Sequence, residues 1–363
     1  MRPGSLFEGY HIWVIAPSVE SDDPNINYYY DFDQSIQEYT KVFEELSLSW
    51  TWQIIRLDNY QKIIEEIKGD AQLRKVLVLN LCDGDEVNQA PGISVIRELE
   101  LHRLNYTGSK EFFYEVTTSK IPMKKVFDDS KINTPIWEVL AEDGSSIPGI
   151  FERLGSPIII KPSVSGGSMG VGITNVVETE VDCKKVLDKI KEGYRGWNLL
   201  IDGIIAERFI PGREFTTLIV GSYTNPSELI YYSPIERVFN KTLPATEQFL
   251  SFDRLWETYD EESSLGENEY LFQYHPPEKN LNEQIKKLSI DSYIALRGTG
   301  YTRIDIRMDS NDKTMYVLEA NAQCGLSEDE NYTSIGAILR VNNKKFSELI
   351  SEIMNEAIIR KAS

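Results

Sequence analysis

Two runs near the C-terminus, residues 301–308 and 315–321, constrain the fold of this chain most strongly. Both alternate between apolar and polar side chains, and both are rich in residues that favour strands. The residues that follow the first run, Asp-Ser-Asn-Asp-Lys at 309–313, are typical of a turn. The segment therefore predicts a β-hairpin with a longer loop.

The polar residues of this hairpin indicate a site. Because side chains alternate across a strand, Arg303, Asp305 and Arg307 share one face of the first strand, and Glu319 and Asn321 share one face of the second. Three oxygen-bearing side chains can therefore converge beside an arginine. Mg²⁺ prefers oxygen ligands, often one or two carboxylates with substrate phosphates completing the shell. The pattern predicts a metal site, and the alternative is a solvated strand face with ordinary ion pairs.

Length and charge limit the classes of function. The chain has 363 residues, which is enough for two or three domains, and a formal net charge of −19. This charge argues against nucleic acid or an anionic membrane as a partner. No apolar run approaches the length of a membrane span, and residues 12–16 are too short for the core of a signal peptide. Three scattered cysteines without metal-ligand spacing favour the reducing cytoplasm.

The first third of the chain alternates short apolar runs with helical periodicity. Strands are predicted at 12–16, 52–55 and 76–81, and helices at 33–48, 60–67 and 93–104. This alternation predicts a parallel, doubly wound sheet, whose ligands bind beyond the carboxyl ends of its strands. Tyr28, Tyr29 and Tyr30 are candidates for lining such a site, and simple packing of these rings is the alternative.

A glycine-rich segment follows a short predicted strand in the middle of the chain. The strand, 157–160, ends at Lys161, and the sequence Ser-Val-Ser-Gly-Gly-Ser-Met-Gly-Val-Gly occupies residues 163–172. Glycines let backbone N–H groups approach a phosphate, and the lysine supplies a point charge. The lysine precedes the glycines, so the segment is neither a P-loop nor a dinucleotide fingerprint. A hairpin turn that binds nothing is the alternative.

The second half of the chain has strand and helix signals around one irregular segment. Strands are predicted at 215–220 and 229–232, and helices at 281–296 and 346–359. Between residues 233 and 276 the sequence shows little periodicity. Long irregular segments in compact proteins are often lids or binding loops, and we expect one here.

Four motifs occur in a fixed order: a helix at Lys120, the strand and glycine-rich loop at Lys161, Glu-x-x-x-x-Gly-x-Glu-Phe from Glu207, and Glu-x-Asn from Glu319. In this order they resemble the ATP-grasp fold, and most closely the D-alanine–D-alanine ligase-like group. The resemblance extends from residue 76 to the C-terminus. It implies an α/β (mixed α+β) fold class, an ATP-grasp fold with an N-terminal Rossmann-like parallel-sheet domain. The implied domains are 1–116, 117–206 with the glycine-rich loop, and 207–363 with the metal-binding hairpin and lid.

The resemblance also implies the residues that bind ATP. Lys120 and Lys161 would contact the phosphates, and Glu214 would accept hydrogen bonds from the ribose. The remaining implied contacts are the loop over the phosphates (Ser165, Gly166, Gly167, Ser168), the adenine hinge (Glu207, Arg208, Phe209, Ile210) and the lid (Arg254).

The implied chemistry is amide formation. A substrate carboxylate would attack the γ-phosphate of ATP, and an amine would attack the acyl phosphate, so ATP becomes ADP. The implied catalytic groups are Lys161, Arg303 and the backbone N–H of Gly325. Asp305, Glu319 and Asn321 would bind Mg²⁺, with Mn²⁺ as a possible substitute.

Small-molecule carboxylates and amines are the implied partners, and related enzymes suggest a homodimer. Neither nucleic acid nor a membrane is expected as a partner. Two alternatives remain: a nucleotide-binding regulatory protein of the same fold that has lost catalysis, and a kinase-like enzyme that acts on a protein.

Residues 327–331, Ser-Glu-Asp-Glu-Asn, depart from the family pattern. Members of the group have small hydroxyl residues there, which hold the carboxylate of the acceptor, and a proline where this chain has Cys324. Acidic side chains repel a carboxylate at close range. We therefore expect an acceptor that is cationic or lacks a free carboxylate, and not the dimerisation of D-alanine. Glu20 is a candidate for binding a donor ammonium, and a solvated loop acid is the alternative.

Overall fold

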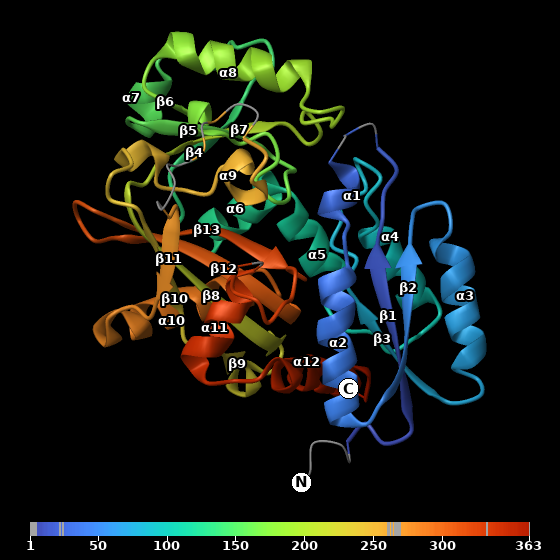
Figure 1. The fold of residues 1–363 in the computed structure, drawn as a ribbon. Helices are drawn as coiled ribbons and strands as arrows, with labels where there is room; N and C mark the ends of the chain where they lie inside the picture. The colour runs from blue at the N-terminus through green and yellow to red at the C-terminus, as the bar shows by residue number, and fades with distance from the viewer. Residues whose placement is uncertain are drawn as a thin grey trace.

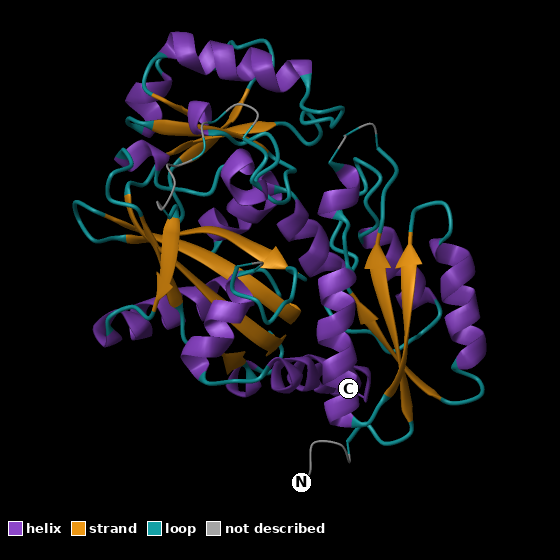
Figure 2. Cartoon of the chain, in the orientation of Figure 1, coloured by secondary structure: helices purple, strands orange, loops and turns teal. Residues whose placement is uncertain are grey.

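Figure 1 shows a computed structural model of the protein, which describes residues 6–21, 23, 25–259, 262, 264, 270–331 and 333–362. Part of the predicted lid, residues 260, 261, 263 and 265–269, therefore lies outside the described residues. The strands form three sheets that helices flank (Figure 2). One sheet is parallel and two are antiparallel, which confirms the predicted mixed fold class.

The first sheet is parallel and has the strand order β2-β1-β3. It contains β1 (Tyr10–Pro17), β2 (Ser49–Ile55) and β3 (Lys75–Asn80), and it is flanked by α2 (Asp33–Leu46), α3 (Tyr60–Asp70) and α4 (Ile93–Leu101). Helices on both sides leave β3 buried along nearly its whole length, which explains its unbroken apolar run. These six predicted elements are confirmed. A short helix, α1 (Ile26–Tyr29), precedes α2.

The second sheet is antiparallel, with the order β4-β7-β5-β6. Its strands are β4 (Trp137–Leu140), β5 (Ile158–Pro162), β6 (Val176–Val177) and β7 (Ile204–Arg208), and α7 (Ile150–Leu154) and α8 (Glu180–Glu192) lie on its outer side (Figure 1). The hydroxyl of Thr179 caps α8 by accepting from the N–H of Asp182. The glycine-rich segment joins β5 to β6. The predicted boundary between 206 and 207 falls within β7, and the division into three domains stays a prediction.

The third sheet has the order β11-β10-β8-β12-β13, with one short strand beside β8. Its strands are β8 (Gly212–Ser222), β9 (Ile230–Tyr231), β10 (Ile235–Phe239), β11 (Phe272–His275), β12 (Thr299–Asp309) and β13 (Met315–Ala322). The predicted hairpin is confirmed as β12 and β13. The prediction of little structure in 233–276 is wrong at β10 and β11. In β10 the charged Glu236 and Arg237 are both buried, and these residues interrupt the apolar period of the strand.

Two layers of helices cover the third sheet. On one face lie α5 (Glu111–Thr118), α6 (Lys120–Asp129) and α10 (Lys279–Ala295), which share a core with β8, β12 and β13. On the other face, α11 (Ser334–Asn342) and α12 (Phe346–Ala362) pack together with α2 and β1 (Figure 1). Tyr39 and Phe43 of α2 contribute to this second core. The parallel sheet is therefore held against the hairpin sheet by a shared apolar layer.

Two expectations from the sequence concern membrane spans and cysteines. Among the helices of the described residues, none combines the length and the apolar character needed to cross a bilayer. Cys82, Cys183 and Cys324 are all buried, and all three are free thiols.

Candidate functional site

A cleft of about 1550 Å³ is lined by residues from all three sheets. Pockets for a single drug-sized molecule usually measure about 300–1,000 Å³, so this cleft has room for more than one small ligand. Every residue that the resemblance implies for ATP, metal or catalysis lines it: Lys120, Lys161, Ser165, Gly166, Gly167, Ser168, Glu207, Arg208, Phe209, Ile210, Glu214, Arg254, Arg303, Asp305, Glu319, Asn321 and Gly325. The structure thus brings together residues that are up to 205 positions apart in the chain, from Lys120 to Gly325.

The hairpin presents its polar residues to this cleft. In the β12–β13 pair, Arg303 lies opposite Asn321 and Asp305 lies opposite Glu319, followed by a bulge after Asp305. The Asn321 Nδ2 atom is 3.0 Å from Asp305 Oδ2 and 3.5 Å from Glu319 Oε1. Arg303 Nη2 donates to Asp305 Oδ2 at 2.9 Å. The predicted convergence of three oxygen-bearing side chains beside an arginine is therefore present.

This donor set fits Mg²⁺. Within the described ranges no group of three or more His, Cys, Asp or Glu side chains forms a cluster that could hold a metal by itself. Mg²⁺ is usually held by one or two carboxylates together with waters and phosphates, and Asp305 and Glu319 supply that number. A half-turn of the Asn321 amide would direct its Oδ1 toward the two carboxylates, since the two amide orientations are nearly isosteric. Burial opposes ionisation of Asp305, but the charge of Arg303 overcomes it and holds its pKa below the ordinary value.

Lys120 connects the glycine-rich loop to the hairpin. This lysine begins α6, and its Nζ donates to the carbonyl oxygen of Ser165 at 3.3 Å and to the Ser165 hydroxyl at 3.2 Å. The same Nζ lies 4.0 Å from Glu319 Oε2. A phosphate between loop and hairpin would therefore meet a cation that is already in place.

Lys161 and Glu207 form an ion pair in the cleft. Lys161 Nζ is 2.6 Å from Glu207 Oε1, across the β5–β7 pair. A second lysine, Lys124, lies 2.5 Å from Glu207 Oε2 and is almost completely buried. Burial would raise the pKa of Glu207, but the charges of Lys124 and Lys161 overcome it and lower this pKa to about 2. Sequence reasoning missed Lys124, although its i+4 spacing from Lys120 places both lysines on one face of α6.

The glycine-rich loop is covered by the segment that was predicted to be a lid. Trp256, which ends α9 (Phe252–Trp256), donates from Nε1 to the carbonyl oxygen of Gly167 at 3.0 Å. The Ser168 hydroxyl donates to the carbonyl oxygen of Leu250 at 2.9 Å. Gly167 has a φ of +55°, and a Cβ on it would lie 3.1 Å from the Trp256 ring. The glycine is therefore needed both for its backbone conformation and for close approach of the indole.

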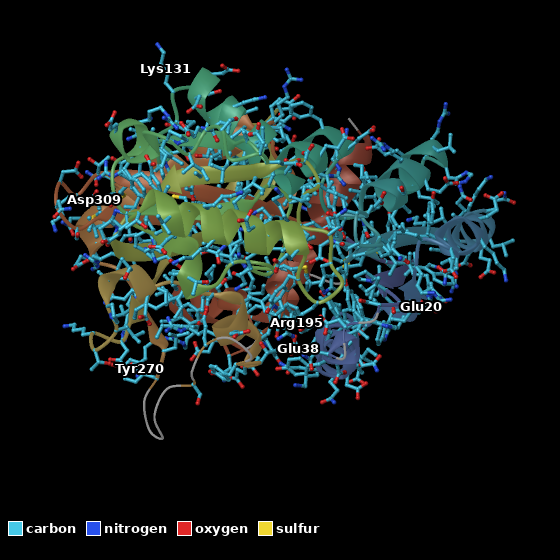
Figure 3. All side chains as sticks on the ribbon, turned by 90° about the horizontal axis from the view of Figure 1, so that it is seen from above. Glu20, Glu38, Lys131, Arg195, Tyr270 and Asp309 are labelled. Atoms are coloured by element: carbon cyan, nitrogen blue, oxygen red, sulfur yellow. The ribbon has the colours of Figure 1, made fainter. Side chains whose placement is uncertain are left out.

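Aromatic residues of the N-terminal segment complete this cover. The rings of Tyr29 and Trp256 are 4.8 Å apart between centroids, and Tyr28 also contacts Trp256 edge-on. Arg195, labelled in Figure 3, donates to the Tyr29 hydroxyl at 2.8 Å. Tyr28, Tyr29 and Tyr30 line the cleft and also pack, so both interpretations of these residues hold. Glu20, labelled in the same figure, is exposed and is absent from the residues that line the cleft, as expected of a solvated acid.

The predicted adenine hinge consists of the last two residues of β7, Glu207 and Arg208, and the next two residues, Phe209 and Ile210. Phe209 packs edge-on against Phe249, with ring centroids 6.0 Å apart, and the guanidinium carbon of Arg307 lies 5.2 Å from the centroid of the Phe209 ring. Arg208 is held by Asp309, with 2.6 Å between Nη2 and Oδ2. Backbone groups of Arg208 and Phe209 already bond to neighbouring loops, because their N–H groups donate to Ile136 and Pro157. Contact with adenine stays a prediction for this segment.

Two predicted ATP contacts are engaged by other protein groups. The carboxylate of Glu214 accepts hydrogen bonds from Arg237 and Arg307. The guanidinium of Arg254 donates to Glu247 Oε2 at 2.7 Å and to the Glu247 carbonyl oxygen at 2.7 Å. Both side chains are fixed by these partners, and their roles toward ribose and phosphate stay predictions.

The loop after the hairpin contains Gly325 and the three acids. A Cβ on Gly325 would meet no protein atom within 4 Å, so the protein's own packing does not require a glycine there. Glu328 lies 3.3 Å from Lys41 Nζ, and Glu330 lies 2.7 Å from Arg340 Nε. The net negative charge expected from this run is therefore smaller than its sequence suggests.

Among the three acids of this loop, Asp329 accepts hydrogen bonds from neutral donors in the part of the chain that the structure describes. Its Oδ2 accepts from the Gln34 amide at 3.3 Å, and its Oδ1 accepts from the Asn331 N–H at 2.9 Å. Sequence reasoning treated the three acids alike, because the cationic partners of the other two come from distant helices.

Comparison with known proteins shows what the chain is similar to. A family model described as "D-ala D-ala ligase C-terminus" matches residues 126–355. The D-alanine–D-alanine ligase of Pediococcus pentosaceus is 26% identical over 305 residues, which cover 80% of this chain and 76% of that protein. The enzyme of the same name from Bordetella petrii is 27% identical over 259 residues, which cover 71% and 70%.

Solved structures show the same fold. The D-alanine–D-alanine ligase from Bacillus anthracis, whose crystals contained ATP, superposes with a TM-score of 0.66 at 18% identity, over 97% of this chain and 98% of that chain. D-alanyl-alanine synthetase A from Vibrio cholerae superposes with a TM-score of 0.67 at 16% identity, over 96% and 99%. The predicted ATP-grasp fold is thereby confirmed.

These comparisons agree on the class of protein. They favour an ATP-dependent carboxylate–amine ligase over the non-catalytic alternative. The names of the relatives give no support to the expectation that D-alanine is not the acceptor. Because the matched residues make up more than half of the chain, the protein belongs to the D-alanine–D-alanine ligase family of ATP-grasp enzymes, which form C–N bonds.

Proposed function

We propose that the protein joins a small carboxylic acid to an amine through an acyl phosphate, at the expense of ATP. The carboxylate oxygen attacks the γ-phosphorus, and the bond to the β-phosphate oxygen breaks, so that ADP leaves. The amine nitrogen then attacks the acyl carbon, inorganic phosphate leaves, and the nitrogen loses a proton. The observation that carries this proposal is the meeting of Lys120 and Lys161 with Asp305 and Glu319 in one cleft. Two anions can approach one another only where cations compensate their charge.

Each group of the cleft has a role in this proposal. Asp305, Glu319 and Asn321 would hold Mg²⁺, or Mn²⁺ in its place, which as a Lewis acid neutralises phosphate charge. Lys120 and Lys161 would hold the phosphates from the side of the glycine-rich loop. Arg303 and the N–H of Gly325, which both line the cleft, would stabilise the oxyanion that forms when the amine attacks.

The cover over the loop would protect the intermediate. An acyl phosphate is hydrolysed when water reaches it, and a closed lid excludes water. Trp256 joins the lid to Gly167, and its contact with Tyr29 joins the lid to the N-terminal segment. The aromatic contacts thus connect three parts of the chain above the site where the acyl phosphate would form.

We further propose that the acceptor amine carries a second positive charge. Asp329 in the loop after Gly325 has described contacts only with neutral donors, and Asp31, Asp83 and Asp85 line the same cleft. A cation at about 4 Å from one carboxylate gains about 4 kcal/mol at an effective dielectric constant of about 20, before desolvation is subtracted. The second candidate is D-alanine, which the names of the relatives favour.

Acceptor kinetics separate these two candidates. We expect kcat/KM for diamines or basic amino acids to exceed that for D-alanine by about tenfold or more, and the difference to shrink as salt is added. The variant Asp329→Asn should lower kcat/KM for cationic acceptors while leaving neutral amines within about twofold. ADP formation in the presence of each amine provides the measurement. D-alanine as the best acceptor, with no effect of Asp329→Asn, would refute the cationic acceptor and establish the second candidate.

Two further expectations complete the proposal. The free, buried cysteines fit the reducing cytoplasm, and fractionation of cells would test this location. A homodimer is proposed from the resemblance alone, and sedimentation of the purified protein would test it. Phosphate release from Mg·ATP with mixed acids and amines distinguishes a ligase from a non-catalytic nucleotide binder, because only a ligase is stimulated by its substrates.

A further inference from the structure

Lys124 is a buried cation that the proposed reaction does not use. It lies on α6 with a side chain that is 1% exposed, and no part of it lines the cleft. Its Nζ is 2.5 Å from Glu207 Oε2 and 2.8 Å from Thr134 Oγ1. The Thr134 hydroxyl donates to the carbonyl oxygen of Val317, so its oxygen is free to accept from the lysine. Both neighbours therefore hold Lys124 in one orientation.

Glu207 is shared between this buried lysine and one that faces the cleft. Its other carboxylate oxygen accepts from Lys161 at 2.6 Å, and the Lys161 side chain is 17% exposed and lines the cleft. Glu207 is ionised, since the two lysine charges lower its pKa despite burial. Two lysines and one carboxylate leave one net positive charge in this group. That surplus charge is available only on the side of Lys161, because Lys124 is enclosed by protein.

We infer that Lys124 is a positioning residue for the nucleotide site: it compensates Glu207, so that the positive charge of Lys161 remains available to the phosphates. This inference rests on the proposed nucleotide site, in which Lys161 contacts phosphate. Without Lys124, Glu207 would neutralise Lys161 and hold it at the inner wall of the cleft. Loss of Lys124 should then weaken the binding of a ligand more strongly, the more phosphates the ligand carries.

The contact with Thr134 joins this group to the metal-binding strand. Val317, whose carbonyl accepts from Thr134, is two residues before Glu319 on β13, and its N–H donates to the carbonyl of Asn133. Lys124 contacts Glu207 of the proposed adenine hinge and Thr134, and Thr134 bonds to the strand that carries the proposed metal ligand Glu319. A single buried residue fixes the two ends of the nucleotide site relative to one another.

The variant Lys124→Met tests this inference in a binding experiment without turnover. Titration of Mg·ADP should show a Kd about tenfold or more higher than in wild type, whereas the Kd for adenosine should change less than about twofold. Lys125→Met, which removes the exposed lysine next in sequence, is the matched control and should change neither Kd. A residue that only supports the fold would weaken both ligands alike, and equal losses would overturn the inference.

The double variant Lys124→Met/Glu207→Gln provides a second, independent readout. It removes one positive and one negative charge, so the group again carries one net positive charge on Lys161. We expect its Kd for Mg·ADP to return to within about threefold of wild type. If Lys124→Met alone does not fold, the double variant still tests the inference. A Kd of the double variant for Mg·ADP that is tenfold or more above wild type would contradict it. Failure of wild type to bind Mg·ADP would instead contradict the proposed function.

Discussion

Glu319→Gln should lower kcat by about 1,000-fold while the protein remains folded. The substitution keeps the shape of the side chain and removes one of two carboxylate charges from the proposed metal site. Metal ions stabilise a transferring phosphoryl group by several kcal/mol, and about 4 kcal/mol corresponds to about 1,000-fold in rate. The measurement is ADP formation at saturating ATP and Mg²⁺, together with the thermal unfolding temperature of the variant.

Glu138→Gln is the matched control for this experiment. Glu138 is also partly exposed and also ion-paired, with 2.7 Å between its Oε1 and Arg153 Nη2, but it is absent from the cleft. We expect its kcat to stay within about twofold of wild type, since exposed ion pairs contribute little. Near-normal turnover of Glu319→Gln across a range of Mg²⁺ concentrations would remove the hairpin from the assigned site.

Lys161→Ala should weaken the binding of Mg·ATP by about 10- to 100-fold. A charge-assisted hydrogen bond contributes about 1.5–3 kcal/mol, and 1.4 kcal/mol is tenfold in affinity. The fold should tolerate the change, because Glu207 keeps its second partner, Lys124, at 2.5 Å. Titration with Mg·ADP and the KM for ATP provide two separate measurements of this effect.

Lys184→Ala is the control for the loss of one lysine. Lys184 lies on α8, is ion-paired with Asp188 at 2.8 Å, and is absent from the cleft. Lys184→Ala lowers the net charge of the protein by the same amount as Lys161→Ala. It therefore separates the loss of a contact in the cleft from the effect of the protein's overall charge. If Lys184→Ala and Lys161→Ala weakened Mg·ATP equally, the phosphate contact assigned to Lys161 would be untenable.

The elements predicted most accurately are those in which burial determines the pattern of apolar and polar residues. Strands β1 and β3 are enclosed by helices, so their apolar runs follow directly from their place in the sheet. The β12–β13 hairpin has alternating side chains and a turn-rich loop, and it forms with Asp305 opposite Glu319. In such segments local pattern and tertiary packing demand the same structure.

The features that the sequence concealed depend on contacts between distant segments. Strand β10 contains two adjacent buried charges, Glu236 and Arg237, which pair with Arg213 and Glu214, so its sequence does not show the pattern of a strand. Lys124 appears as an ordinary helix lysine until β7 places Glu207 beside it.

The acidic run after Gly325 shows the same limit. Glu328 and Glu330 look like free negative charges in the sequence, but Lys41 of α2 and Arg340 of α11 compensate them. A charge argument made from neighbouring residues alone therefore overestimates the field that an acceptor would meet.

We propose above all that the hairpin and the glycine-rich loop hold one Mg·ATP between them. A crystal structure with Mg²⁺ and a non-hydrolysable ATP analogue tests it most directly. We predict metal density bridging Asp305 and Glu319 to the analogue's phosphates, with Lys120 and Lys161 on the opposite side of those phosphates. A nucleotide bound elsewhere, or phosphates that contact neither the hairpin nor the two lysines, would contradict the account.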